Sequence, residues 1–181
     1  MKDGFLKAAA LSPALRVADC GYNAAQVVDA MRQCSQRGVK LAVFPELCLT
    51  GYTCGDLFLQ RTLQQGALDA LDQVLSASTG LDLVTLVGLP LLLHGKLYNC
   101  AAVVSGGRLL GLVPKTYLPN YAEFYEKRHF VPGSTQVETV TVCGQQTLFG
   151  TSLLFACRQM PSFVLGVECL LYTSPSPRDR S

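Results

Sequence analysis

The amino-acid sequence predicts an α/β fold, and two observations carry this prediction. Short apolar strands alternate with amphipathic helices through the first half of the chain, and strands joined by glycine-containing turns fill the second half. The composition agrees with a packed interior, since 49% of the 181 residues are hydrophobic and only 15% are charged, against about 25% charged residues in an average protein. A chain of this length forms one domain or part of a larger one.

Periodicity places the first two strands and helices. Residues 5–11 form an apolar strand, after which Asn23 is the expected cap of an amphipathic helix. Residues 39–44 form the next strand, and Asp56 is the expected cap of a longer helix with apolar residues on one face. This order of strand, helix, strand and helix is the basis of the α/β assignment.

The remainder of the chain is rich in predicted strands. The sequence Ser105-Gly106-Gly107 is typical of a tight turn and predicts a hairpin between the strands on either side of it. A long loop of aromatic and charged residues covers positions 115–134. The strands predicted in this half cover residues 83–88, 98–104, 108–113, 137–142, 147–149 and 163–167.

Charge and composition exclude several classes of partner. The net charge is only +2 and the basic residues are scattered, so neither a nucleic-acid surface nor a basic membrane patch is expected. The first twenty residues do not fit a secretion signal, and the apolar segment 81–93 is too short to span a bilayer. His94 and His129 have no spacing typical of metal ligands. We therefore expect a cytoplasmic protein with reduced cysteines, no metal site, and a small molecule or a protein as partner.

Three chemically useful positions follow predicted strands. Glu46 comes after the strand that ends near Phe44, Lys115 comes after the strand that ends near Val113, and Glu168 and Cys169 come after the last strand. Ligands of open α/β sheets bind outside the carboxyl ends of the strands, so these positions are expected to meet in one site. Taken singly, Glu46 is equally a solvated turn residue and Lys115 a surface lysine.

Together, these residue types indicate a hydrolytic centre. A carboxylate whose environment is tuned by burial acts as a general base, and a fixed ammonium stabilises a developing oxyanion. Such a pair calls for a nucleophile, and a thiol is the natural candidate in a chain with eight cysteines.

Two segments carry a family resemblance. Residues 44–52 (FPELCLTGY) and 113–121 (VPKTYLPNY) resemble the glutamate and lysine motifs of the nitrilase, or carbon-nitrogen hydrolase, superfamily. Within that superfamily, residues 123–128 and 149–155 are similar to the amidase domain of bacterial glutamine-dependent NAD(+) synthetases. The resemblance runs from about residue 5 to residue 168.

The resemblance implies a fold and a site. The fold is a four-layer α-β-β-α sandwich, here incomplete at the C-terminus. The implied roles are Glu46 as general base, Lys115 as oxyanion stabiliser and Tyr121 as a glutamine-binding residue, while Tyr52 is expected in the pocket. No metal takes part in this site.

The resemblance also implies a reaction. A cysteine thiolate attacks the side-chain amide of L-glutamine, ammonia leaves, and water hydrolyses the thioester. The ammonia passes to a synthetase domain of the same parent chain, which is a ligase of NAD biosynthesis that uses ATP and Mg²⁺ to amidate nicotinic acid adenine dinucleotide. The glutaminase half needs no cofactor, and proteins of this family tend to form homo-oligomers.

The sequence departs from the family pattern at the nucleophile. The family has an apolar residue and then the catalytic cysteine after the position of Glu168, whereas Cys169 follows Glu168 directly. A shift of one residue along a strand reverses the direction of the side chain. Residues 169–181 also change abruptly in composition and resemble a translated sequencing adapter.

These observations support one main hypothesis and two alternatives. Residues 1–168 are interpreted as a partial glutaminase domain and residues 169–181 as a non-native tail, so that Cys169 is out of register and the fragment is inactive. Residues 170–181 are expected to pack against nothing. The alternatives are a stand-alone amidase or nitrilase that acts on another carbon–nitrogen bond, and a non-catalytic scaffold of the same fold. The sequence of the source DNA past codon 168 distinguishes all three.

Overall fold

A computed structural model of the protein describes residues 4–120 and 124–168. Within these residues the chain forms a seven-stranded sheet in the order β1-β2-β3-β4-β5-β7-β6 and a separate two-stranded sheet of β8 and β9. The elements in chain order are β1 (Ala8–Ala10), α1 (Cys20–Gln36), β2 (Leu41–Val43), η1 (Gly55–Leu59), α2 (Arg61–Ser78), β3 (Val84–Leu93), β4 (Lys96–Ser105), β5 (Arg108–Pro114), η2 (Glu126–Arg128), β6 (Glu138–Val142), β7 (Gln145–Phe149), β8 (Leu154–Cys157) and β9 (Met160–Gly166), where η marks a 3₁₀ helix.

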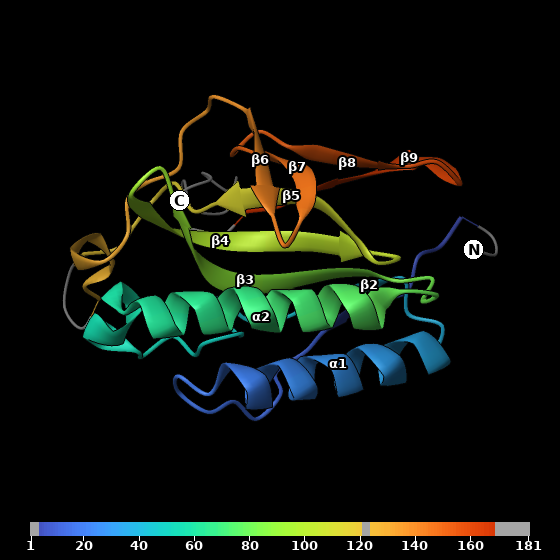
Figure 1. The fold of residues 1–181 in the computed structure, drawn as a ribbon. Helices are drawn as coiled ribbons and strands as arrows, with labels where there is room; N and C mark the ends of the chain where they lie inside the picture. Colours follow the sequence, from blue (N-terminus) through green and yellow to red (C-terminus); the bar gives the residue numbers. More distant parts are fainter. Residues whose placement is uncertain (1–3, 121–123, 169–181) are drawn as a thin grey trace, which may run out of the picture.

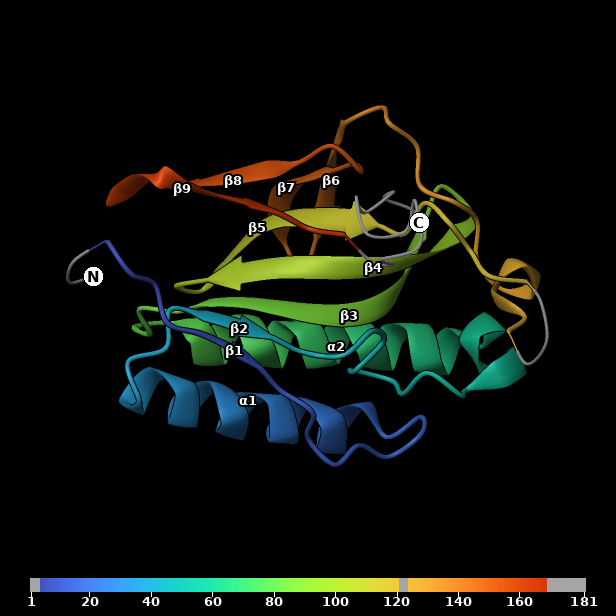
Figure 2. The same cartoon turned by 180° about the vertical axis from the view of Figure 1, so that it is seen from behind.

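The elements stack in layers. Helices α1 and α2 lie side by side against one face of the large sheet, and the β8–β9 ribbon lies over the opposite face (Figures 1 and 2). The order of layers is therefore helix, sheet, sheet, which agrees with three layers of the predicted sandwich. None of the helices in the described part of the chain is long and apolar enough to cross a membrane.

Strand pairing explains how separate segments reach the same edge of the sheet. β1, β2 and β3 pair in parallel, β3, β4 and β5 form an antiparallel meander, and β5 pairs in parallel with β7. The predicted hairpin between β4 and β5 is confirmed, with Ser105 opposite Arg108 and both Gly106 and Gly107 at positive φ. Since β2 and β5 run in the same direction, their carboxyl ends point to the same side.

The main core lies between the helices and the large sheet. Val27 and Met31 of α1 and Leu71 and Val74 of α2 are fully buried, at the helical spacing that the sequence predicts. Burying a side chain of this size contributes roughly 1.5–3 kcal/mol relative to leaving it exposed. The packing fixes both helices on the sheet.

Both predicted helix caps are wrong. Helix α1 begins earlier than expected, because the carboxylate of Asp19 accepts a hydrogen bond from Tyr22 N at 3.1 Å. Asn23 is buried within the helix, where its side chain binds the backbone N and O of Arg16, each at 2.8 Å. Asp56 lies in η1 and pairs with Arg128, and α2 starts only at Arg61. In each case the side chain makes a contact outside the helix instead of capping it, with Arg16 for Asn23 and with Arg128 for Asp56.

Strand boundaries also differ from the prediction. The third strand continues past Gly88 to Leu93, because the residues beyond Pro90 remain paired with β4. The sequence does not predict β8, since its four residues are too few to show a period.

Gly88 in the middle of β3 allows the turn after β2 to approach the sheet. A Cβ atom at this position would lie 2.3 Å from the backbone N of Leu47 and 3.0 Å from the carbonyl O of Pro45. The backbone O of Gly88 accepts a hydrogen bond from Leu49 N at 3.1 Å. The turn that carries Glu46 therefore rests directly on β3, and only glycine leaves room for it.

We predict that Gly88→Ala destabilises the protein by about 1–3 kcal/mol or more, because the new methyl group overlaps backbone atoms that cannot move independently. Gly21→Ala is the matched control. Gly21 lies in α1, and a Cβ atom added there would have nothing within 4 Å, so the change should stabilise by up to about 1 kcal/mol. Urea unfolding of the two variants checks both values, and equal stabilities would contradict the close approach at Gly88.

Candidate active site

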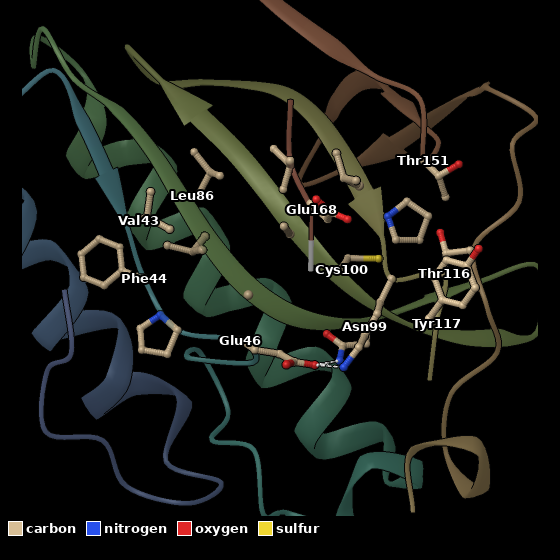
Figure 3. A pocket seen from close by; sticks show the side chains of 18 of the residues that line it. Val43, Phe44, Glu46, Leu86, Asn99, Cys100, Thr116, Tyr117, Thr151 and Glu168 are labelled. Carbon is tan, nitrogen blue, oxygen red and sulfur yellow. Dashed lines mark hydrogen bonds and ion pairs between the residues drawn. The ribbon is translucent and has the colours of Figure 1, made fainter. Parts of the chain in front are cut away.

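A cavity of about 610 Å³ opens at the carboxyl ends of β2 and β5, with β3 and β4 forming its floor (Figure 3). In this view Glu46 and Asn99 meet at one side, Thr116, Tyr117 and Thr151 lie on another, and Glu168 lies between the two groups. The residues that line the cavity are Val43, Phe44, Pro45, Glu46, Leu86, Val87, Gly88, Asn99, Cys100, Ala101, Val113, Pro114, Lys115, Thr116, Tyr117, Thr135, Thr151, Val167 and Glu168.

Glu46 reaches the cavity from the turn that follows β2. Its side chain is 25% exposed and accepts two hydrogen bonds at the same oxygen, Oε1. One donor is Lys115 Nζ at 2.7 Å, and the other is the side-chain amide of Asn99. The predicted meeting of Glu46 and Lys115 is therefore confirmed, although the two residues lie 69 positions apart.

Lys115 follows β5 directly, and hydrogen bonds fix both its backbone N and its backbone O. Its N donates to Asn99 O and its O accepts from Gly133 N, each at 2.8 Å. The side chain is only 2% exposed. Its ammonium contacts two carboxylates, Glu46 Oε1 and Glu126 Oε1, each at 2.7 Å.

Glu126 is the site residue that the sequence does not reveal. It begins η2 in the long aromatic loop, and its side chain is 5% exposed. Its Oε1 accepts from Lys115 Nζ at 2.7 Å and from the Tyr52 hydroxyl at 2.6 Å, while no donor from the described residues reaches its Oε2. In the sequence, Glu126 lies in the segment 123–128 that carries the family resemblance, but no pattern there assigns it a role beside Lys115.

The two carboxylates determine the charge state of Lys115. Burial alone would lower the pKa of its ammonium, but hydrogen bonds and charge interactions with Glu126 and Glu46 outweigh burial and raise the pKa above its usual 10.5. Lys115 is therefore a cation at neutral pH. A fixed cation in a partly enclosed cavity is suited to stabilising an oxyanion.

The other predicted site residues fare differently. Tyr52 is not among the residues that line the cavity, but its hydroxyl donates to Glu126 Oε1, which also binds Lys115, so its place in the pocket stays a prediction. Tyr121, Cys169 and the tail 169–181 lie outside the described residues, so the roles predicted for them stay predictions. Glu168, the last described residue, lines the cavity, so β9 leads the chain to this site.

The layered α/β fold, with a carboxylate and a buried ammonium at one cavity, defines the class of protein to which this chain belongs. The family model for carbon-nitrogen hydrolases matches residues 7–162, so the chain is a member of the carbon-nitrogen hydrolase family.

Within that family the chain is similar to one kind of protein. It is 44% identical over 165 residues to the glutamine-dependent NAD(+) synthetase of Mycobacterium tuberculosis, which covers 91% of this chain and 24% of the relative. It is 37% identical over 125 residues to the glutamine-dependent NAD(+) synthetase of Thermotoga maritima, which covers 69% of this chain and 21% of the relative. The chain therefore spans about a quarter of the length of the curated relatives it matches.

Solved structures confirm the nitrilase type of fold. A glutamine-dependent NAD(+) synthetase from Cytophaga hutchinsonii superimposes with a TM-score of 0.79 at 27% identity, covering 84% of this chain and 26% of that protein. An amidase from Nesterenkonia sp. matches with a TM-score of 0.61 at 22% identity, covering 78% of this chain and 53% of that protein. The second likeness concerns the fold alone.

We predict that Lys115 and Glu126 stabilise the protein as a coupled pair. Lys115→Met should cost about 3–5 kcal/mol because it leaves the buried carboxylate of Glu126 without a counter-ion, and Glu126→Gln should cost about 1–3 kcal/mol. The double variant should lose less than the sum, as measured by urea unfolding in a double-mutant cycle. Lys127→Met, at the exposed neighbouring position, is the control and should stay within about 0.5 kcal/mol of the parent. Additive losses would contradict the pair.

The raised pKa of Lys115 predicts how its contribution depends on pH. A group whose pKa is higher in the folded state stabilises that state below its unfolded pKa, and the contribution disappears as the pH rises through the folded value. The difference in unfolding free energy between the parent protein and Lys115→Met should therefore be constant near neutral pH and shrink above the usual value of 10.5. A difference that grows with alkaline pH would have the wrong sign.

Proposed function

We propose that this chain is the amino-terminal part of the glutaminase domain of a glutamine-dependent NAD(+) synthetase, and that the domain supplies ammonia to a synthetase domain. The observation that carries the proposal is the contact of Glu46 with the buried ammonium of Lys115 at one wall of a 610 Å³ cavity. The similarity to glutamine-dependent NAD(+) synthetases supports glutamine as the substrate.

In the proposed reaction, Glu46 takes the proton of a cysteine thiol, and the thiolate forms a bond to the amide carbon of glutamine. The carbonyl oxygen becomes an oxyanion, which Lys115 stabilises. The carbon–nitrogen bond then breaks as Glu46 returns the proton to the leaving nitrogen, and ammonia departs. Water, deprotonated by Glu46, hydrolyses the thioester to glutamate and restores the thiol.

The position of β9 supports a nucleophile just past Glu168. β9 ends at Gly166, and both Val167 and Glu168 line the cavity that holds Glu46 and Lys115. A residue that follows Glu168 closely is therefore within reach of the site. We propose that the native chain continues there with the family's apolar residue and catalytic cysteine, that residues 169–181 are not native, and that the chain as written is inactive.

The remaining features of the proposal concern substrate and partners. Thr116, Thr135 and Thr151 line the cavity, and a threonine hydroxyl can donate to or accept from a polar substrate, although that of Thr151 already donates to Ser134 O. Tyr121 is proposed to bind glutamine. ATP and Mg²⁺ are proposed for the synthetase domain, and none of the glutaminase steps needs a cofactor. We further propose a cytoplasmic protein that forms homo-oligomers.

The nucleotide sequence of the source beyond codon 168 tests the continuation directly. We expect codons for an apolar residue followed by Cys-Glu-Asp, and later a Ser-Gly-Gly-x-Asp-Ser loop for ATP. Independent clones that repeat the codons for residues 169–181 would contradict the proposal and favour a non-catalytic scaffold. A continuation that carries the cysteine but lacks the ATP loop would favour a stand-alone amidase.

We predict that the protein read through past codon 168 hydrolyses L-glutamine to glutamate and ammonia, and that Lys115→Met lowers kcat by about 10²–10³-fold, as loss of an oxyanion donor does. Ammonia release measured with L-glutamine and with L-asparagine, which is one methylene shorter, checks the activity and its specificity. Lys127→Met is again the control. Hydrolysis that survives in Lys115→Met would contradict the proposed role of Lys115.

A further inference from the structure

Asn99 occupies a central place in the site that the proposed reaction does not use. It lies in β4, between the segments that carry Glu46 and Lys115, and is only 2% exposed. Its side-chain Nδ2 donates to Glu46 Oε1, and its backbone O accepts from Lys115 N at 2.8 Å. One residue of the sheet thus touches both partners of the candidate catalytic pair, and Figure 3 shows its contact with Glu46.

We propose that Asn99 is a positioning residue that holds the carboxylate of Glu46 in one orientation, with Oε1 bound and Oε2 available to accept a proton. This inference rests on the proposed function of Glu46 as the general base. It states that the side chain of Asn99 determines which of the two oxygens of Glu46 accepts the proton.

The hydrogen bonds of Glu46 distinguish its two oxygens. Oε1 accepts from both Asn99 Nδ2 and Lys115 Nζ, whereas within the described part of the chain no donor reaches Oε2. An oxygen that already accepts two hydrogen bonds has little capacity left for a proton, so Oε2 is the basic atom. The direction in which Oε2 points decides whether it can accept the proton of the thiol.

Lys115 cannot set this orientation alone. The terminal torsion of a glutamate side chain has a broad energy profile, so the carboxylate turns easily. An ammonium has three equivalent donors and follows a carboxylate as it turns. Asn99 is buried and its backbone is fixed in β4, so its planar carboxamide is a more restricted donor than an ammonium, and a second bond from it limits the turning of the carboxylate.

Asn99 is uncharged, and this also affects how well Glu46 can act as a base. Glu46 and Glu126 carry two negative charges and Lys115 carries one positive charge, so this cluster has a net charge of −1. A second cation beside Glu46 would complete the ion pairs and weaken the carboxylate as a base. An amide donates a hydrogen bond without adding charge. It therefore orients the base and leaves its excess negative charge in place.

The first test observes the contact without any reference to activity. In the NMR spectrum of this chain, the side-chain amide protons of Asn99 should exchange slowly with water, because they are buried and bound to a carboxylate. Glu46→Gln replaces the charged acceptor by a neutral one and should shift the Asn99 signal and speed its exchange. Glu168→Gln, in the same cavity but without a hydrogen bond to Asn99, is the control. An Asn99 signal that ignores Glu46→Gln, or responds equally to the control, would overturn the proposal.

The second test measures the consequence for the proposed reaction in the protein read through past codon 168. Asn99→Leu keeps the approximate size of the side chain and removes the donor. With L-glutamine, kcat should fall about 10–100-fold, while KM should change less than about threefold. Unfolding in urea shows whether the variant is folded.

A second substrate separates positioning from general damage. The γ-(4-nitrophenyl) ester of glutamate loses nitrophenolate, which leaves as an anion and needs no proton, whereas the amide needs a proton from Glu46 before ammonia leaves. Asn99→Leu should therefore slow the amide more than the ester. Equal losses on both substrates, or no loss, would overturn the proposal. If the parent protein hydrolyses neither substrate, the proposed function is wrong, and the NMR result alone decides whether Asn99 orients Glu46.

Discussion

The structure of this site depends on the burial of one positive charge. An ammonium removed from water is stable only when anionic partners surround it, and Lys115 has two, Glu46 and Glu126. These carboxylates come from the turn after β2 and from η2, so a single ion cluster connects three separate stretches of the chain. The loop that carries η2 is also attached to the rest of the fold by the ion pair of Arg128 with Asp56 and by the ring contact of Phe130 with Phe58. The same cluster keeps a cation beside the cavity, where an oxyanion would form in the proposed reaction.

The sequence predicts the parts of the site that follow strands. Glu46 and Lys115 each stand directly after an apolar run and a proline, and the direction of the strands brings them together. Glu126 and Asn99 carry no such mark. Glu126 belongs to a charged segment of the resemblance that gives it no individual role, and Asn99 lies inside a strand, where the purpose of a polar residue is not evident until its neighbours are known. Residues whose role arises only from the tertiary fold leave no local pattern.

The difference between local patterns and tertiary contacts also explains which parts of the fold the sequence predicts. The layered α/β class, both helices and the β4–β5 hairpin follow from periodicity and turn residues, which are local signals. The residues at which the helices begin do not follow from these local signals. Asp19 and Asn23 are both good caps by residue type, and the choice falls on Asp19 because Asn23 binds the backbone of Arg16. Asp56 likewise pairs with Arg128 rather than capping α2. In both places a residue of the capping type makes other hydrogen bonds or ion pairs that the local pattern does not predict.

The β8–β9 ribbon has a consequence for the handling of this polypeptide. Among the strands that the structure describes, these two pair only with each other, and Leu154 and Val164 are more than half exposed on them. Strand edges with free backbone donors and acceptors beside apolar side chains readily recruit the same edges of other molecules. Concentrated solutions of the chain should therefore self-associate through this ribbon, and charged substitutions at these two positions are the natural means of keeping the protein monodisperse.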